Sequence, residues 1–217
     1  YHLAPAPALR HASQHPLDHL GDEDGHRGPS CTTHLSVVDR LGNVVTLTQT
    51  LLSVFGSKVT LPGSGILMNN GINWFDPRPG RPNSLAPGKR TLSNYVPVLG
   101  ETPDRVFGIG ASGGRKIIPA MTQLGLMLAS GMTLDEAMHQ PRIDVSSPDG
   151  VVMDPRLDPS IRSALAEVHP TSEGRAGFAP NNYATALAVL REKGRNQGAV
   201  DPLHPWAEAV SEEEVTQ

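Results

Sequence analysis

The pattern of apolar and polar positions changes sharply near residue 32. Residues 33–38 are mostly apolar or β-branched, residues 39–43 have the chemistry of a turn, and residues 44–50 return to a strand pattern. Two such runs joined by a short segment with Asp, Gly and Asn predict a β-hairpin. We expect its first strand to begin at Thr32 or Thr33.

A strand, a glycine turn and a helix are predicted between residues 106 and 131. Residues 106–110 have the pattern of a buried strand, residues 111–114 are Ala-Ser-Gly-Gly, and residues 115–130 carry apolar side chains at helical spacing before a stop at Gly131. The apolar positions of this helix are Ile117, Ile118, Met121, Leu124 and Leu128. The glycine turn therefore joins the end of a strand to the start of a helix.

Three shorter elements are also predicted. Thr133 and Glu136 form a capping box, which indicates a short helix that Pro141 ends. Residues 161–168 predict another short helix and residues 184–190 a late strand. Because helices and strands alternate along the chain, we expect an α/β (α+β) fold in which both share one layered core.

Two segments are expected to lack helix and strand. Residues 1–31 contain five of the nine histidines and no sustained periodicity, so we interpret them as a largely disordered tail or linker. The spacing of His11, His15 and His19 could suit a metal only on a helix, which a proline interrupts, so no metal site is expected. Residues 76–84 are rich in proline and predict a stiff loop at a surface or a cleft.

Composition and charge exclude several classes of protein. The 217 residues are 38% apolar, which is enough for a core, and the formal charge of -4 without a Lys/Arg cluster argues against nucleic acid or an anionic membrane as a partner. No apolar run approaches the roughly 20 residues of a membrane span, and the single cysteine excludes an internal disulfide. We expect no cofactor, because the dinucleotide and Walker patterns are missing. The compartment is left open, with the cytoplasm slightly favoured.

Two local features could carry chemistry. Gly113 and Gly114 lie between a strand and a helix, where backbone amides can point at an anion, so they could form a phosphate site, an oxyanion hole or a simple tight turn. Thr32 lies at the start of a strand, and such a threonine can use its own α-amine as a base once the preceding peptide bond is cut. On local sequence alone a structural threonine and a tight turn remain the alternatives.

Short motifs follow one another in a fixed order from residue 32 to about residue 205. They are TTHLSVVD (32–39), GN (42–43), TQT (48–50), FG (55–56), SGILMNN (64–70), PGKRTLS (87–93), GASGG (110–114), PR (141–142) and GAVDP (198–202). In content and order they resemble the small, catalytic subunit of the γ-glutamyltranspeptidases, a family of N-terminal-nucleophile (Ntn) hydrolases.

This resemblance implies a fold and a partner. The family forms an αββα sandwich from a large and a small subunit, so residues 32–217 would be the small-subunit half and residues 1–31 the end of the large subunit. The partner would be the protein's own large subunit, in a heterodimer. Because residues 1–31 are continuous with Thr32, the chain as written is uncut. It is then either the precursor form or a truncated sequence that would expose apolar surface.

The resemblance also implies a set of catalytic residues. The precursor would cut itself between Cys31 and Thr32, which makes Thr32 the nucleophile and its freed amine the general base. Thr50 matches the threonine that supports the nucleophile. Gly113 and Gly114 match the pair whose amides form the oxyanion hole.

The expected substrate-binding residues depart from the family pattern. Ser93 matches the first of two serines that hold the donor's α-carboxylate, and Asn94 replaces the second. Where the family binds the donor's α-amino group, Leu52 replaces Asn, Gly71 replaces Gln or Glu, and Trp74 replaces Asp. These three cannot hold an ammonium except through a cation–π contact with the Trp.

Four functions remain open at this stage. The default is transfer of a γ-glutamyl group to water or an amine, with glutathione as the example of a donor. The same chemistry could act on a donor that is not γ-glutamyl, such as a glutaryl amide, or on a C–C bond next to a carbonyl, as in a biosynthetic branch of the family. The chain could also be a catalytically silent, unprocessed fragment.

Overall fold

The computed structural model describes residues 31–177 and 182–211 of the chain. By compactness the described residues fall into two units. One holds Cys31 with residues 50–93, and the other holds residues 32–49 with residues 94–211. The expected tail lies outside the described residues, apart from Cys31.

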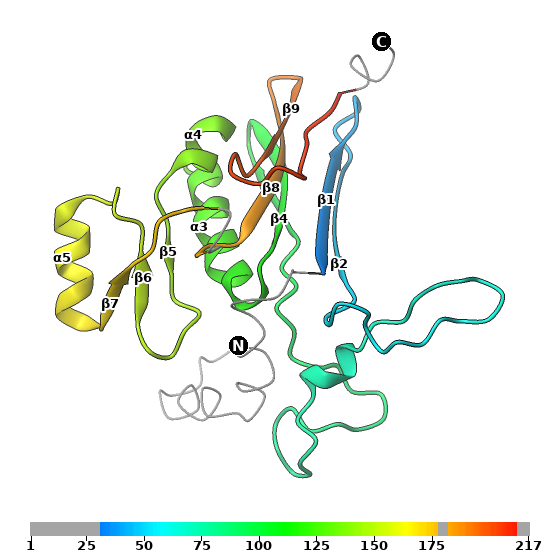
Figure 1. Ribbon diagram of the computed structural model, residues 1–217. Helices are drawn as coiled ribbons and strands as arrows, with labels where there is room; N and C mark the ends of the chain where they lie inside the picture. The colour runs from blue at the N-terminus through cyan, green and yellow to red at the C-terminus, as the bar shows by residue number, and fades with distance from the viewer. Residues whose placement is uncertain (1–30, 178–181, 212–217) are drawn as a thin grey trace. The chain divides into compact units, whose positions relative to one another are not determined.

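Two antiparallel sheets lie face to face in the larger unit. The hairpin has the strands β1 (Thr32–Val38) and β2 (Val44–Thr50). The second sheet has the order β3-β4-β8-β9, with β3 (Val98–Thr102), β4 (Arg105–Ser112), β8 (Thr185–Glu192) and β9 (Arg195–Val200). Figure 1 shows β1 on one side of β4 and β8 and the helices on the other side. The layered α+β prediction is therefore confirmed.

The hairpin turn is stabilised by its Asp and Gly residues, as the sequence predicts. The Asp39 carboxylate accepts hydrogen bonds from the backbone N–H groups of Leu41 and Asn43, each at 2.8 Å. Gly42 has a φ of 94°, in the left-handed region that favours glycine. The predicted hairpin and its first residue, Thr32, are confirmed.

The helices α3 (Ile117–Ala129) and α4 (Leu134–His139) cover one face of the four-stranded sheet. Alternate residues of β4, namely Phe107, Ile109 and Ala111, join the apolar face of α3 in the core. The capping box of α4 is present in both directions. Both helices were predicted, although α3 begins after a short 3₁₀ turn instead of at residue 115.

A small third sheet has the order β5-β6-β7, with β5 (Ile143–Asp144), β6 (Val151–Met153) and β7 (Thr171–Glu173). Helix α5 (Pro159–Val168) connects the parallel strands β6 and β7. It begins two residues before the predicted start, because Asp158 caps it and Pro159 occupies its first turn.

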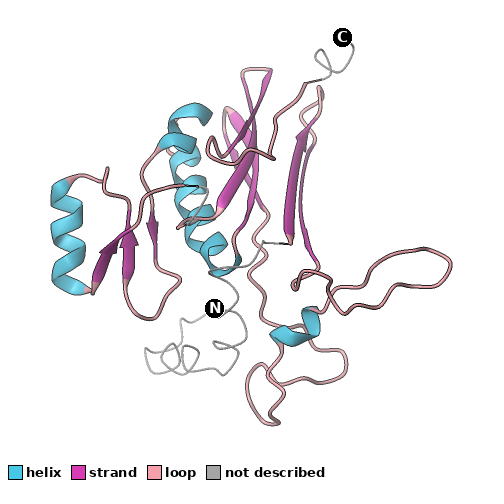
Figure 2. Ribbon diagram, viewed as in Figure 1, coloured by secondary structure: helices cyan, strands magenta, loops and turns pink. Residues whose placement is uncertain are grey.

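Residues 51–93 consist almost entirely of loops (Figure 2). Their regular elements are the 3₁₀ helix η1 (Gly71–Trp74) and two isolated bridges, Thr60 to Leu67 and Asp76 to Ser84. The Pro-rich loop at 76–84 is confirmed as neither helix nor strand, yet Asp76, Asn83 and Ser84 are buried in it. Within the described part of the chain, no helix is long and apolar enough to cross a membrane.

Candidate active site

Thr32 is the first residue of β1, and Cys31 directly precedes it in irregular chain. Both residues are partly buried. Burial raises the pKa of the Cys31 thiol, which keeps this side chain neutral at physiological pH. A cut between these residues would leave β1 whole, because the bond lies outside the strand.

The register of the hairpin places the two expected threonines at the same end. His34 and Thr48 lie opposite each other, with the ring Nδ1 2.8 Å from the hydroxyl Oγ1. Thr32 precedes His34 by two residues in β1, and Thr50 follows Thr48 by two in the antiparallel strand β2. Both threonines therefore lie at the open end of the hairpin.

Leu52 follows β2 in a backbone conformation that is unusual for leucine. Its φ is 71°, and its N–H donates to the Thr50 hydroxyl at 3.0 Å. Asparagine adopts left-handed backbone more readily than leucine does. The turn therefore has a backbone shape that suits asparagine better than the leucine that occupies it.

The glycine turn connects β4 to α3, as predicted. Gly113 has a φ of 142° and Gly114 one of 61°, so both use backbone that side chains disfavour. A Cβ on Gly113 would lie 2.8 Å from the Ala184 Cα, so only glycine fits there. Burial lowers the pKa of the nearby Lys116 ammonium, although Asp144 opposes this effect. The turn can present backbone N–H groups at the start of a helix, where anions bind.

Asn94 lies next to this turn. Its Nδ2 atom is 3.9 Å from the position that a Cβ on Gly114 would occupy. Asn94 follows Ser93 directly in the chain. Ser93 is the last residue of the unit that holds residues 50–93, which we call the loop unit, and Asn94 belongs to the larger unit. The structure thus brings Asn94 and Gly114 together.

Arg142 supports the glycine turn, a role that the sequence did not reveal. This buried guanidinium donates to the carbonyls of Met138 at 3.1 Å and Ala184 at 3.4 Å, and lies 4.0 Å from the Asp201 carboxylate. Because Ala184 abuts Gly113, Arg142 fixes the wall against which the turn rests. The PR and GAVDP motifs therefore meet in one ion pair, which could not be inferred from their spacing.

His34 was also missed as a site residue. It is 5% exposed, with Nδ1 bonded to Thr48 and Nε2 lying 2.9 Å from the Ser36 hydroxyl and 3.1 Å from the Thr46 hydroxyl. Burial lowers its pKa to about 4, so the imidazole is neutral at neutral pH. His34 lies within the TTHLSVVD motif, but its burial between two sheets depends on tertiary structure and could not be inferred from the motif.

Gly71 and Trp74 occupy one face of η1, because residues three apart eclipse each other in a 3₁₀ helix. A Cβ on Gly71 would lie 3.0 Å from Cζ3 of the indole and 3.2 Å from Oδ1 of Asn69. The Trp74 ring thus occupies the space in which a side chain at position 71 would lie. The two departures from the family pattern are sterically linked.

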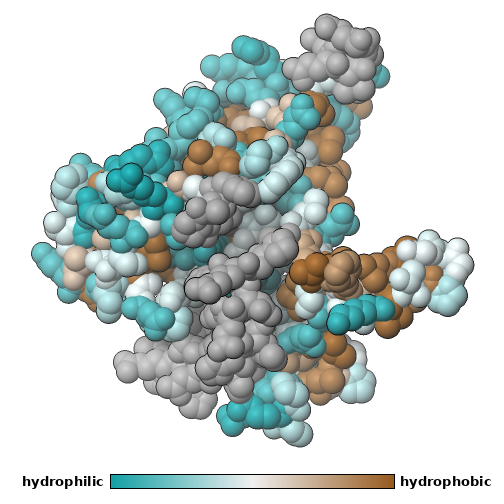
Figure 3. Space-filling model, viewed as in Figure 1, coloured by the Kyte–Doolittle hydropathy of each residue, from teal (hydrophilic) through white to brown (hydrophobic). Residues whose placement is uncertain are grey.

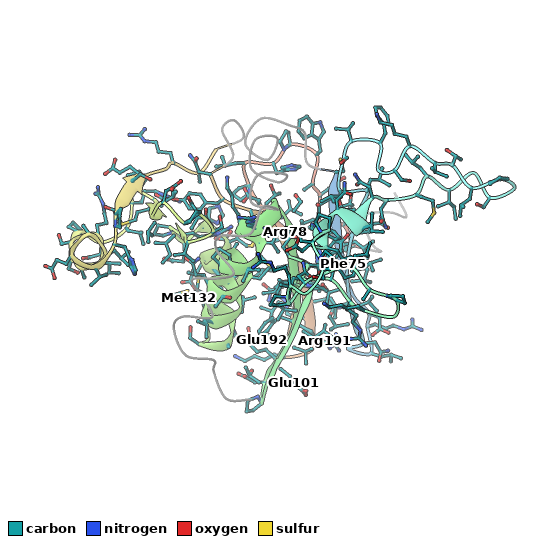
Figure 4. The ribbon with its side chains drawn as sticks, turned by 90° about the horizontal axis from the view of Figure 1, so that it is seen from below. Phe75, Arg78, Glu101, Met132, Arg191 and Glu192 are labelled. Carbon is teal, nitrogen blue, oxygen red and sulfur yellow. The ribbon has the colours of Figure 1, made fainter. Side chains whose placement is uncertain are left out.

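Asn83 joins the two ends of the loop that follows η1. Its Nδ2 donates to the Trp74 carbonyl at 2.6 Å, and its Oδ1 accepts from the Leu92 N–H at 3.0 Å. Its backbone carbonyl accepts from the Asp76 N–H at 2.8 Å. Fully buried Asp76 is paired with Arg78, which is labelled in Figure 4. The side chain of Asn83 therefore links Trp74 to Leu92, the residue before Ser93.

The described residues contain no group of three or more His, Cys, Asp or Glu side chains that could hold a metal ion. The expectation that the protein uses neither metal nor cofactor stays a prediction.

Comparisons with known proteins identify the family. The model of the family described as Gamma-glutamyltranspeptidase matches residues 5–210. The chain belongs to this family. It is 38% identical over 200 residues to a glutathione hydrolase proenzyme from Pseudomonas sp. (strain A14), covering 82% of this chain and 34% of that protein. It is also 38% identical over 138 residues to an acylase ACY 1 proenzyme from Pseudomonas sp. (strain SE83), covering 63% of this chain and 24% of that protein.

Solved structures of gamma-glutamyltranspeptidases share the fold. The enzyme from Pseudomonas nitroreducens complexed with L-DON matches with a TM-score of 0.63 and 26% identity, over 82% of this chain and 99% of that chain. The fold is that of the Ntn hydrolases, as expected. The chain nevertheless spans only about a quarter to a third of the length of the two curated relatives above.

Proposed function

We propose that this gamma-glutamyltranspeptidase-family chain is the catalytic part of an Ntn amidohydrolase or acyltransferase, with Thr32 as the nucleophile. The proposal is based on the position of Thr32, which is the first residue of β1. In the same unit, the Gly113–Gly114 turn directly follows strand β4. A threonine at a strand start and preorganised amide donors are the two parts that acyl transfer needs.

The proposed reaction has two steps. The Thr32 hydroxyl attacks the donor's amide carbonyl while its proton passes to the α-amine of the same residue, and the leaving amine departs with that proton. The N–H groups of the glycine turn stabilise the oxyanion, a contribution of about 3–4 kcal/mol for one donor in comparable sites. Water or an amine then attacks the ester on Thr32, and the hydroxyl regains its proton.

The free α-amine requires a cut between Cys31 and Thr32, which we propose the protein makes itself. The two curated relatives described above are named proenzymes. A solved, acivicin-inhibited gamma-glutamyltranspeptidase is described as revealing critical roles for its C-terminus in autoprocessing and catalysis. The proposed partner is the large subunit that such a cut releases. Residues 1–31 would then be its end and residues 32–217 the small subunit.

The nature of the donor divides the proposal into two candidates. The first candidate is a γ-glutamyl donor such as glutathione, consistent with the name of the Pseudomonas relative. An amide whose acyl group has no α-ammonium is favoured by Leu52, Gly71 and Trp74, because none of them offers a carboxylate or amide acceptor. The acylase relative is consistent with this second candidate. Ser93 and Asn94 would hold a carboxylate in both.

Replacing Thr32 tests the reaction. We expect Thr32→Ala in the full-length protein to abolish both self-cleavage and amide turnover, whereas the matched change Thr33→Ala, at an exposed position, should leave a new N-terminus at Thr32. Denaturing gels with intact-mass and N-terminal analysis give the readout. Turnover retained by Thr32→Ala would show that another residue is the nucleophile, and an uncut wild-type protein would favour the silent fragment.

A comparison of γ-glutamyl- and glutaryl-p-nitroanilide tests the donor. We expect a higher kcat/KM for the glutaryl compound, and Trp74→Asp should raise kcat/KM for the γ-glutamyl compound, because it adds a carboxylate that can accept from the α-ammonium. Gly71→Glu should be tolerated better together with Trp74→Asp than alone, since the indole fills the space at position 71. A wild-type preference for the γ-glutamyl compound would refute this account of the pocket.

A further inference from the structure

The two halves of the proposed catalytic machinery lie on different sheets. Thr32 belongs to β1 in the hairpin, and the Gly113–Gly114 turn follows β4 in the four-stranded sheet. Hydrogen bonds within one sheet cannot set the spacing between two sheets. Another contact must therefore fix the distance from the nucleophile to the oxyanion donors.

One contact between the sheets lies close to both halves. His34 is two residues after Thr32, and Gly110 is three residues before Gly113, or roughly 7 and 10 Å along the respective strands. A Cβ on Gly110 would lie 2.0 Å from Cε1 of the His34 ring, 2.2 Å from Nδ1 and 2.5 Å from Nε2. The imidazole therefore rests directly on the bare backbone of β4.

Hydrogen bonds hold the ring in this place and determine its tautomer. The Thr46 hydroxyl donates to the Ile109 carbonyl at 3.2 Å, which ties the cluster to β4. The Ser36 hydroxyl donates to the Thr46 oxygen at 3.2 Å, so neither hydroxyl has a proton left for Nε2 of His34. Nε2 therefore carries the hydrogen and faces the Ser36 and Thr46 oxygens at 2.9 and 3.1 Å as acceptors. Nδ1 then accepts from the Thr48 hydroxyl. The buried ring is thus fixed on both edges and pressed against Gly110 by its face.

We propose that His34 is a positioning residue, which sets the spacing between the strand of Thr32 and the strand that leads to the Gly113–Gly114 turn. This inference rests on the proposed function, because it takes Thr32 as the nucleophile and the glycines as oxyanion donors. The lowered pKa of the ring agrees with the inference, since a neutral imidazole keeps one donor and one acceptor. A displacement of about 1 Å in such an arrangement can lower a rate roughly a hundredfold.

Two glycines of β4 provide a matched test. Gly110→Ala would place a methyl group against the His34 ring, whereas Gly108→Ala would place one 2.7 Å from Cγ1 of Val44, at the turn end of the hairpin and far from Thr32. Neither glycine has a positive φ, so the backbone accepts alanine at both positions. Both variants disturb the packing of the hairpin on the four-stranded sheet, but only Gly110→Ala disturbs it near Thr32.

We expect Gly110→Ala in the full-length protein to lower kcat and the rate of self-cleavage about tenfold to a hundredfold. The KM for the donor should stay within about twofold, because the donor-binding residues lie elsewhere. Gly108→Ala should lower the Tm less than Gly110→Ala, because its methyl group overlaps only the end of one valine side chain, and it should change kcat little. Equal effects on kcat at the two positions would overturn the inference.

Variants of His34 complete the test. His34→Asn retains a donor and an acceptor and should keep more activity than His34→Ala. The loss in His34→Ala/Gly110→Ala should be smaller than the product of the single losses, since removal of the ring makes room for the methyl group. Multiplicative losses would show that His34 does not act through Gly110. If Thr32→Ala loses turnover while the glycine variants behave alike, only this inference fails; if Thr32→Ala retains turnover, the proposed function itself fails.

Discussion

At the scale of single residues, His34 predicts how stability depends on pH. Its folded-state pKa is about 4, while an unfolded histidine titrates near 6.5, so the unfolded state binds more protons between these values. The contribution of His34 is therefore fully present above pH 6.5 and is lost as the pH falls to 4. Urea unfolding from pH 7 to pH 4 should show a shallower loss in His34→Gln than in the wild type.

The exposed His139 is the control for this prediction. His139→Gln removes an exposed histidine from α4 and leaves the buried ring of His34 in place, so the part of the pH dependence that His34 contributes should be retained. If His34→Gln and His139→Gln gave the same curve, the ring of His34 would not be held neutral by burial.

At the scale of elements, the sequence predicted those that carry their own local signals. The hairpin has alternation and the Asp39 turn, and α4 has its Thr133–Glu136 capping box. Strands β3 and β9 were not predicted, because β3 contains Gly100 and β9 is the polar run Arg195–Val200; both are strands through pairing with distant β4 and β8. Their stability comes from tertiary contacts and not from propensity.

The same distinction applies to the candidate site. Thr32, Gly113 and Gly114 are candidates from the sequence because a motif and an element boundary coincide at each of them. His34 and Arg142 act through contacts with residues far away in the chain, such as Gly110 and Asp201. No pattern in a single sequence encodes such pairs.

The loop unit yields a prediction about Asn83. Asn83→Ala would remove the hydrogen bonds to the Trp74 carbonyl and the Leu92 N–H, a net cost of about 0.5–1.5 kcal/mol for each, because water can reach the partly buried Trp74 and the exposed Leu92. Because these groups flank the proposed donor-binding residues, we expect the KM for the donor to rise several-fold with a smaller change in kcat. Asn73→Ala, at an exposed position of η1, should leave both constants near the wild-type values. A fall in kcat alone would contradict this role.

At the scale of the whole molecule, the hairpin has apolar side chains on its outward face and polar side chains on its inner face, the opposite of a sheet whose outer face is in water. Its outward face carries Leu35, Val37, Val45 and Leu47, each 40–59% exposed, while its inner face carries His34 and hydroxyl side chains. Figure 3 shows hydrophobic residues gathered along the hairpin. Such an apolar face on an isolated sheet is typical of a surface that another chain covers, which agrees with the proposed large subunit.

Lysine substitutions can test whether this face is covered. In the full-length protein, Leu47→Lys should lose the burial of a leucine, worth about 1.5–3 kcal/mol, and place a charge in an apolar interface, so the Tm and the co-purification of the two subunits should both fall. Leu41→Lys is the matched control, because Leu41 lies in the hairpin turn and is 79% exposed. Indistinguishable effects of the two lysines would mean that water, and not the large subunit, covers the outward face of the hairpin.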